Sequence, residues 1–169
     1  MPTIILALNY WLHLLASVIW LGGLAMLTLV AWPEMRGRLT DGSTAQEELI
    51  VGIERRFRPL ANISLIVLLV TGMLQMGGDP HYEGFLAITN TWSATLLAKH
   101  CIIVGMLAIT AVLQWGVHPA LDRARLAAQR SEAQKTEAQH QHNRLRVLTA
   151  ANLGLGLLVL VLTAYMTAL

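Results

Sequence analysis

The chain has 169 residues, of which 55% are hydrophobic and only 13% are charged. Soluble domains carry roughly 25% charged residues, so this composition argues against an ordinary soluble protein and indicates a membrane protein. The twelve lysines and arginines give a formal net charge of +2. Because they cluster in two segments, they are typical of membrane-topology signals and not of a surface that binds nucleic acid.

The cysteine content and the first residues narrow the class further. The chain has one cysteine, Cys101, so it offers no paired thiols for an internal disulfide or for covalent attachment of a c-type haem. Residues 1–33 contain no Lys, Arg, Asp or Glu. This apolar run is longer than the core of a signal peptide, and we expect it to be retained as a membrane span.

Four apolar segments follow one another along the chain. They cover residues 3–32, 60–76, 92–117 and 147–169, and each is close to or longer than the ~20 residues that a membrane-spanning helix needs. Helices are expected because a segment in lipid must satisfy its own backbone hydrogen bonds. The sequence therefore predicts an all-α integral membrane protein, a four-helix bundle that forms a single domain over residues 1–169.

The first segment carries one histidine, His13, and no Lys, Arg, Asp or Glu. Asn9, His13 and Trp20 are spaced to lie along one stripe of a helix, and small residues including Gly23 continue it. Such a stripe is expected to face protein. Two interpretations of its far end stay open: Trp20 and Gly23 contact a flat bound cofactor, or the glycine only permits close helix packing.

The second segment has no ionisable residue but contains two methionines near its end, Met73 and Met76. Met166 holds a similar place in the fourth segment. Thioethers are ligands that Cu(I) favours, so these side chains are candidate copper contacts. The alternative is ordinary apolar packing, for which methionine is well suited.

The third segment places Lys99 and His100 side by side in an otherwise apolar run. Ionisable residues inside a membrane are costly, so both are candidates for a function. The stretch that follows, LDRARLAAQRSEAQKTEAQHQHNRLR, is rich in residues that favour helices. We therefore expect the third helix to continue beyond the membrane into the cytoplasm.

Lysines and arginines set the expected orientation. Apart from Lys99, all of them lie between the first and second segments or between the third and fourth. The positive-inside rule then places both of these connections in the cytoplasm and both termini on the opposite side.

His13 and His100 are expected at one depth in the membrane. The first and third helices run in the same direction, and each histidine falls roughly 12–15 Å below the outer surface at 1.5 Å per residue. Neutral imidazole is a common metal ligand and also binds haem iron. His13 and His100 are therefore the predicted metal ligands, for haem iron or for copper; the alternative is that each only hydrogen-bonds another helix.

Lys99 cannot share the face of His100, because adjacent helical residues are ~100° apart. Three roles stay open for it: pairing with an anionic group such as a haem propionate, acting as a ligand or proton donor, and extending to the outer interface. His140 and His142 are expected to be solvated, and His81 lies in the outer connection.

Three stretches of the chain resemble one known family. They are WLHLLASVIWLGGL (11–24), ERRFRPLANISLIVLLVTG (54–72) and WSATLLAKHCIIVGM (92–106), and they are similar to the membrane domain of the copper-resistance protein CopD family. The matching residues are His13, Trp20, Gly22, Arg56, Phe57, Thr71, Gly72 and Lys99. The resemblance covers nearly the whole chain. It implies a multi-pass protein of the bacterial inner membrane that is linked to copper handling, with its termini in the periplasm.

The layout also resembles the HemJ family of protoporphyrinogen oxidases, small four-helix membrane proteins that bind b-type haem and depend on a helix-1 histidine and a helix-3 lysine. His13 and Lys99 match those positions, and ERRF is similar to that family's Glu-Arg-Arg segment. The first helix here ends LVAWPEMRGRL, without the arginine-tyrosine ending of HemJ. This resemblance implies a porphyrin-related activity with Lys99 as the candidate catalytic residue.

Three functions follow from these observations, and whether the protein is an enzyme stays open. The first is electron transfer by a b-type haem with axial His13 and His100, with a quinone or a periplasmic redox protein as partner. The second is copper uptake, transport or resistance through the same histidines. The third is oxidation of protoporphyrinogen IX, with Lys99 orienting a substrate carboxylate. A structural subunit without a cofactor is the non-catalytic alternative, and a homo-oligomer stays open.

Overall fold

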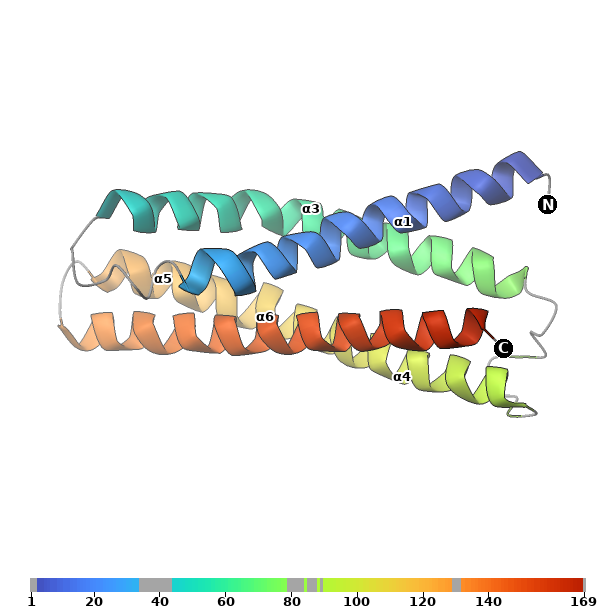
Figure 1. The fold of residues 1–169 in the computed structure, drawn as a ribbon. Helices are drawn as coiled ribbons and strands as arrows, with labels where there is room; N and C mark the ends of the chain where they lie inside the picture. Colours follow the sequence, from blue (N-terminus) through green and yellow to red (C-terminus); the bar gives the residue numbers. More distant parts are fainter. Residues whose placement is uncertain are drawn as a thin grey trace. The chain divides into compact units, whose positions relative to one another are not determined.

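The computed structural model describes residues 3–33, 44–78, 84, 88, 90–128 and 132–168. Every regular element in these residues is a helix and none is a strand (Figure 1). Four of the described helices are long and apolar enough to cross a membrane; they are Thr3–Ala31, Val51–Gly77, Thr91–Ala127 and Thr136–Thr167. The prediction of an all-α, multi-pass membrane protein is confirmed.

The chain divides into two compact units, Met1–Ser93 and Ala94–Leu169, which are described separately. The helices of the first unit are α1 (Thr3–Ala25), its π-helical continuation η1 (Met26–Ala31) and α3 (Thr44–Gly77). The second unit holds α4 (Thr91–Ala111) from Ala94 onward, its π-helical continuation η2 (Val112–Val117), α5 (His118–Ala128) and α6 (Glu132–Thr167).

In the first unit α1 packs beside α3 (Figure 1). The buried residues of α1 and η1 are mostly three or four positions apart, or seven, which is the spacing of one helix face; they are Asn9, Ala16, Trp20, Leu24, Leu27 and Ala31. The predicted stripe through Asn9 and Trp20 is thus confirmed as protein-facing. The opposite surface exposes apolar side chains such as Leu14 and Val18, as contact with lipid requires.

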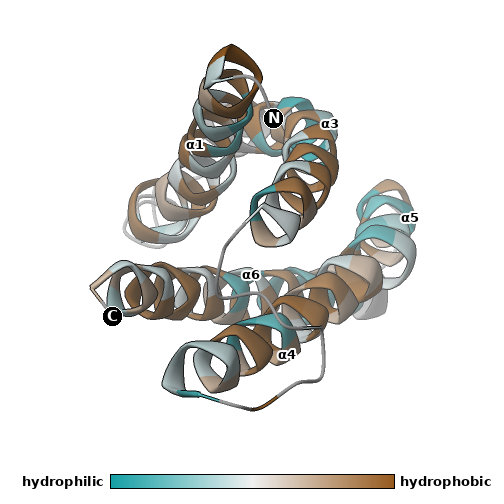
Figure 2. Cartoon of the chain, turned by 90° about the vertical axis from the view of Figure 1, so that its right-hand side faces the viewer, coloured by the Kyte–Doolittle hydropathy of each residue, from teal (hydrophilic) through white to brown (hydrophobic). Residues whose placement is uncertain are grey.

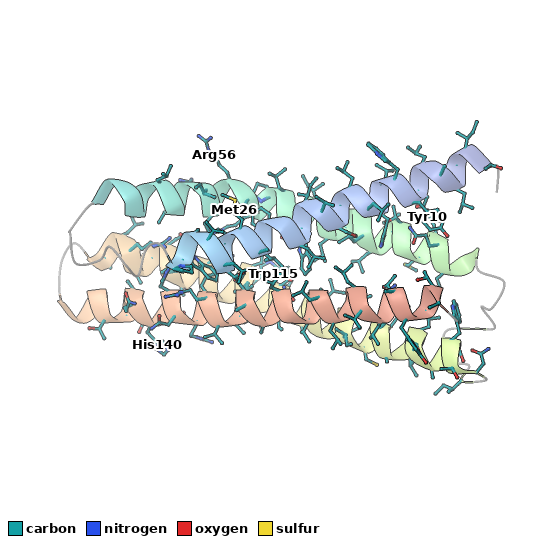
Figure 3. All side chains as sticks on the ribbon, viewed as in Figure 1. Tyr10, Met26, Arg56, Trp115 and His140 are labelled. Carbon is teal, nitrogen blue, oxygen red and sulfur yellow. The ribbon has the colours of Figure 1, made fainter. Side chains whose placement is uncertain are left out.

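α3 begins at Thr44, well before the apolar segment at residue 60, and it continues through Pro59. The charged turn before the proline is compatible with a helix because Arg58 pairs with Glu54 one turn earlier, with 3.0 Å between Nη2 and Oε1. Arg56 instead extends away from α3 (Figure 3). Hydropathy therefore located the membrane-crossing part of this helix but not its start.

In the second unit η2 and α5 pack on α6. The buried residues along η2 and α5 are three or four positions apart; they are Leu113, Val117, Leu121 and Ala124. α5 is visibly more hydrophilic than α1 (Figure 2). The helix that begins at Thr91 thus runs without a break to Ala128, beyond the end of the third apolar segment at residue 117.

Candidate functional site

His13 lies on α1 at the contact with α3. Its Nδ1 atom is 2.8 Å from the hydroxyl oxygen of Thr71, a residue of α3 that is only 5% exposed. The Thr71 hydroxyl donates its hydrogen to the carbonyl oxygen of Val67, at 2.6 Å. Because a hydroxyl has one hydrogen, a Thr71 hydroxyl that donates to Val67 accepts the hydrogen of His13 Nδ1. The lone pair of the neutral imidazole is then on Nε2.

Further polar contacts hold this part of α1 against α3. Asn9 Nδ2, one turn before His13, donates to the carbonyl oxygen of Thr71 at 3.2 Å. A Cβ atom added at Gly72 would lie 3.6 Å from His13 Cε1, so the imidazole edge passes close to the α3 backbone. The ring is thus oriented through its Nδ1 side, which is how metal-binding histidines are commonly held.

Gly23 and Trp20 lie farther along α1. Trp20 is only 3% exposed. A Cβ atom at Gly23 would overlap the aromatic ring of Phe57 on α3. The Phe57 ring therefore occupies the space beside Gly23, which supports close helix packing as the role of this glycine.

His100 is held by its own helix, α4. Its Nδ1 atom is 2.7 Å from the carbonyl oxygen of Leu96, one turn earlier. A carbonyl oxygen can only accept, so Nδ1 carries the hydrogen and Nε2 carries the lone pair of the neutral ring. The contacts of His13 and His100 thus fit the same tautomer, although a second helix supports the first ring and its own helix supports the second.

The neighbours of His100 differ in exposure. Lys99 is half-buried and Cys101 is exposed. Among the residues that the structure describes, no group of three or more His, Cys, Asp or Glu side chains is placed to hold a metal ion. Of the candidate thioethers, Met73 is 68% exposed, whereas Met76 and Met166 are half-buried.

Sequence reasoning missed several buried polar side chains, among them Glu54 and Asn152. Glu54 is 3% exposed beside Arg58, and Asn152 of α6 is 2% exposed. Asn152 Nδ2 donates to the hydroxyl oxygen of Thr110 on α4, at 3.0 Å. The signal for Asn152 was its position in the middle of the fourth apolar segment, where a polar side chain must find a partner.

The expectation of a solvated His142 is wrong, because His142 is only 9% exposed. It lies three positions before the buried Leu145 on the same face of α6. His140 is exposed as predicted and points away from α6 (Figure 3). His81 lies outside the described residues.

Comparison with known protein families gives one match, to copper resistance protein D (CopD), over residues 51–166. The match covers more than half of the chain and includes Thr71, Lys99 and His100, whereas His13 precedes it. The comparisons with curated proteins and with solved structures gave no match. The family match agrees with the helices described above, and this membrane protein belongs to the copper resistance protein D family.

Proposed function

We propose that this protein handles copper ions in the membrane, by uptake or transport, and that His13 and His100 are its copper ligands. Membership of the copper resistance protein D family supports the role of copper. The choice of ligands is based on a contact that the two imidazoles have in common, from Nδ1 to a protein oxygen. Each gives its Nδ1 hydrogen to a protein oxygen and keeps its lone pair on Nε2.

This chemistry suits an ion that moves through an apolar environment. Copper binds imidazole nitrogen well, and Cu(I) also binds thioethers. The exposed Met73, near the end of α3, provides such a thioether. Neutral imidazoles deeper in the helices then replace water around the ion without adding a buried charge of their own.

The proposal includes a topology. Both termini lie in the periplasm, and the four helices cross the bacterial inner membrane. α5 and the first part of α6 then extend into the cytoplasm. The positive-inside rule supports this orientation, because α5 carries Arg123 and Arg125 while the charged turn of α3 carries Arg55 and Arg56.

Copper binding by the detergent-purified protein tests the proposal. The wild type, His13→Ala and His100→Ala are compared at equilibrium with Cu(I) and with Cu(II), and the exposed His140 provides the control variant His140→Ala. We expect each of the first two variants to lose at least about tenfold in affinity, as removal of a ligand should. His140→Ala should bind as the wild type does. Unchanged affinity in both helix variants would contradict the assignment.

A b-type haem with axial His13 and His100 is the second candidate. The same Nε2 lone pairs favour it, because haem iron also takes neutral imidazole. A bound haem would supply one-electron redox chemistry, with a quinone or a periplasmic protein as partner, while Thr71 would orient His13. The Phe57 ring leaves no room for a macrocycle beside Gly23.

The reduced-minus-oxidised absorption spectrum of the same preparations separates the two candidates. Low-spin b-type bands that disappear in both histidine variants would contradict copper handling and support haem binding by these histidines. Absence of these bands together with bound copper supports copper handling. Oxidation of protoporphyrinogen IX, the third function, is supported by the positions of His13 and Lys99 and by the likeness of ERRF to a HemJ segment.

A further inference from the structure

The first helices of the two units change to π-helix at matching positions. Met26 and Val112, the first residues of η1 and η2, are 86 positions apart, and each π-helical segment has 6 residues. Pro33 and Pro119 follow at the same separation. Because π-helical turns are rare in proteins, one in each unit at the same register is a specific landmark.

Buried residues keep the same register in both first helices. Three buried pairs are 86 positions apart: Trp20 and Met106, Leu27 and Leu113, and Ala31 and Val117. A shift of one residue would rotate one pattern by ~100° against the other. The buried pairs therefore define the separation as 86 positions, because a separation of 85 or 87 would not align them.

The second helices of the two units correspond at a separation of 88. α3 begins at Thr44 and α6 at Glu132. The sequences RFRPL (56–60) and RLRVL (144–148) then align, with both arginines and the leucine in common. The buried polar residues Ser64 and Asn152 align as well, at 4% and 2% exposure.

The charged turns of the second helices also correspond. Glu54 is 3% exposed and precedes Arg58 by four positions. The same spacing recurs in α6, where His142 is 9% exposed and precedes Arg146 by four positions. Each second helix thus carries a buried ionisable residue followed, one turn later, by an arginine.

We infer that the two units are copies of one helical hairpin, and that Lys99, not His100, is the counterpart of His13. Lys99 lies 86 positions after His13, whereas His100 aligns with the exposed Leu14. The copies have diverged in packing, since α1 lies along α3 whereas η2 and α5 make most of the contacts to α6.

The two copies carry different groups at this position. The first copy presents an imidazole and the second presents an amine, which donates hydrogen bonds and has no lone pair for a metal while it is protonated.

Site-directed spin labelling of the full-length protein in lipid vesicles tests the duplication without any ligand. Single cysteines are placed along residues 13–32 and 99–118 in a Cys101→Ser background, and the collision rate of each nitroxide with oxygen measures its exposure to lipid. We expect the two exposure profiles to coincide best at a shift of 86, with minima at positions 20, 27 and 31 and at 106, 113 and 117. A best shift of 87, which would align His13 with His100, or the lack of a common shift overturns the inference.

A second scan keeps the test decisive where labelled variants fail to insert. Cysteines along residues 54–65 and 142–153 should give profiles that coincide at a shift of 88, with low exposure at positions 64 and 152. Profiles that coincide at another shift overturn the inference as well. Because neither scan uses copper or haem, a failure here is distinct from a failure of copper binding in the wild type.

Discussion

The two units place a polar side chain between apolar helices with the same device. In the first unit the Thr71 hydroxyl donates to the carbonyl oxygen of Val67 and accepts from His13. In the second the Thr110 hydroxyl donates to the carbonyl oxygen of Met106, at 2.9 Å, and accepts from Asn152. In each case the hydroxyl donates its one hydrogen to a carbonyl oxygen of its own helix and accepts a hydrogen bond from the other helix.

The remaining atoms of the two side chains differ in chemistry. In the tautomer that fits its contact with Thr71, His13 has its lone pair on Nε2, the atom that we propose as a copper ligand. Asn152 has a buried Oδ1 without a hydrogen-bond partner among the residues that the structure describes, and an unsatisfied buried oxygen costs about 1–3 kcal/mol. The contact in the second unit thus joins two helices at some cost in stability.

The largest expected effect is a loss of stability where the helices of the first unit lie closest together. Gly23→Ala places a methyl group into the Phe57 ring, and overpacking of this kind costs about 1–3 kcal/mol. The free energy of unfolding in detergent micelles measures the loss. Adding Phe57→Leu to Gly23→Ala should recover part of it, because the smaller side chain can move aside.

Gly22→Ala is the matched control, since a Cβ atom there would have no atom of the described residues within 4 Å apart from its own stretch of helix backbone. We expect this variant to be as stable as the wild type or slightly more so. Equal stability of Gly23→Ala and Gly22→Ala would contradict the close approach of α1 and α3.

The next effect concerns the ligand atom. Thr71→Val removes the oxygen that accepts the hydrogen of His13 Nδ1, so the ring loses its orientation. Loss of such an orienting partner typically lowers metal affinity by about 10–100-fold. Equilibrium copper binding measures the change.

Thr28→Val is the control for Thr71→Val, because the Thr28 hydroxyl donates to Leu24 and Ala25 of its own helix. Its copper affinity should equal that of the wild type. If Thr71→Val also binds as tightly as the wild type, the Thr71 hydroxyl does not position His13 for copper.

The face of α1 was predictable but its partner was not. The spacing of Asn9, His13 and Trp20 specified a stripe, and the structure buries Asn9 and Trp20. Which residue of α3 meets His13 depends on how the two helices cross and in which register, and neither is encoded in the local pattern. Thr71 was therefore visible only as part of a family resemblance, without a contact.

Local hydropathy also misjudged residues outside the apolar segments. Glu54 and His142 lie in charged stretches and are nevertheless buried, because each helix continues beyond its apolar part and keeps the same face turned inward. Periodicity extended from Leu145 back to His142 would have predicted this burial. The Phe57 ring against Gly23 needed the register of two helices, which a single sequence does not provide.

A smaller effect tests the contact in the second unit. Asn152→Leu removes the hydrogen bond to Thr110 and also removes the unsatisfied Oδ1. Hydrogen bonds between membrane helices contribute about 0.6 kcal/mol on average, which the lost cost of the buried oxygen offsets. We expect unfolding free energies within about 1 kcal/mol of the wild type. A loss above about 2 kcal/mol would mean that Asn152 makes a stronger interaction than the bond to Thr110.

The smallest effect returns to the glycines. A Cβ atom at Gly154 on α6 would have no atom of the described residues within 4 Å apart from its own stretch of helix backbone. Gly154→Ala should therefore only add helix propensity, at most about 1 kcal/mol in unfolding free energy. A large loss in this variant would mean that α6 is approached as closely as Gly23 is by Phe57. A small gain beside the loss in Gly23→Ala would instead locate the close helix contact in the first unit, where a rigid α1–α3 pair is what holds the His13 ring in position.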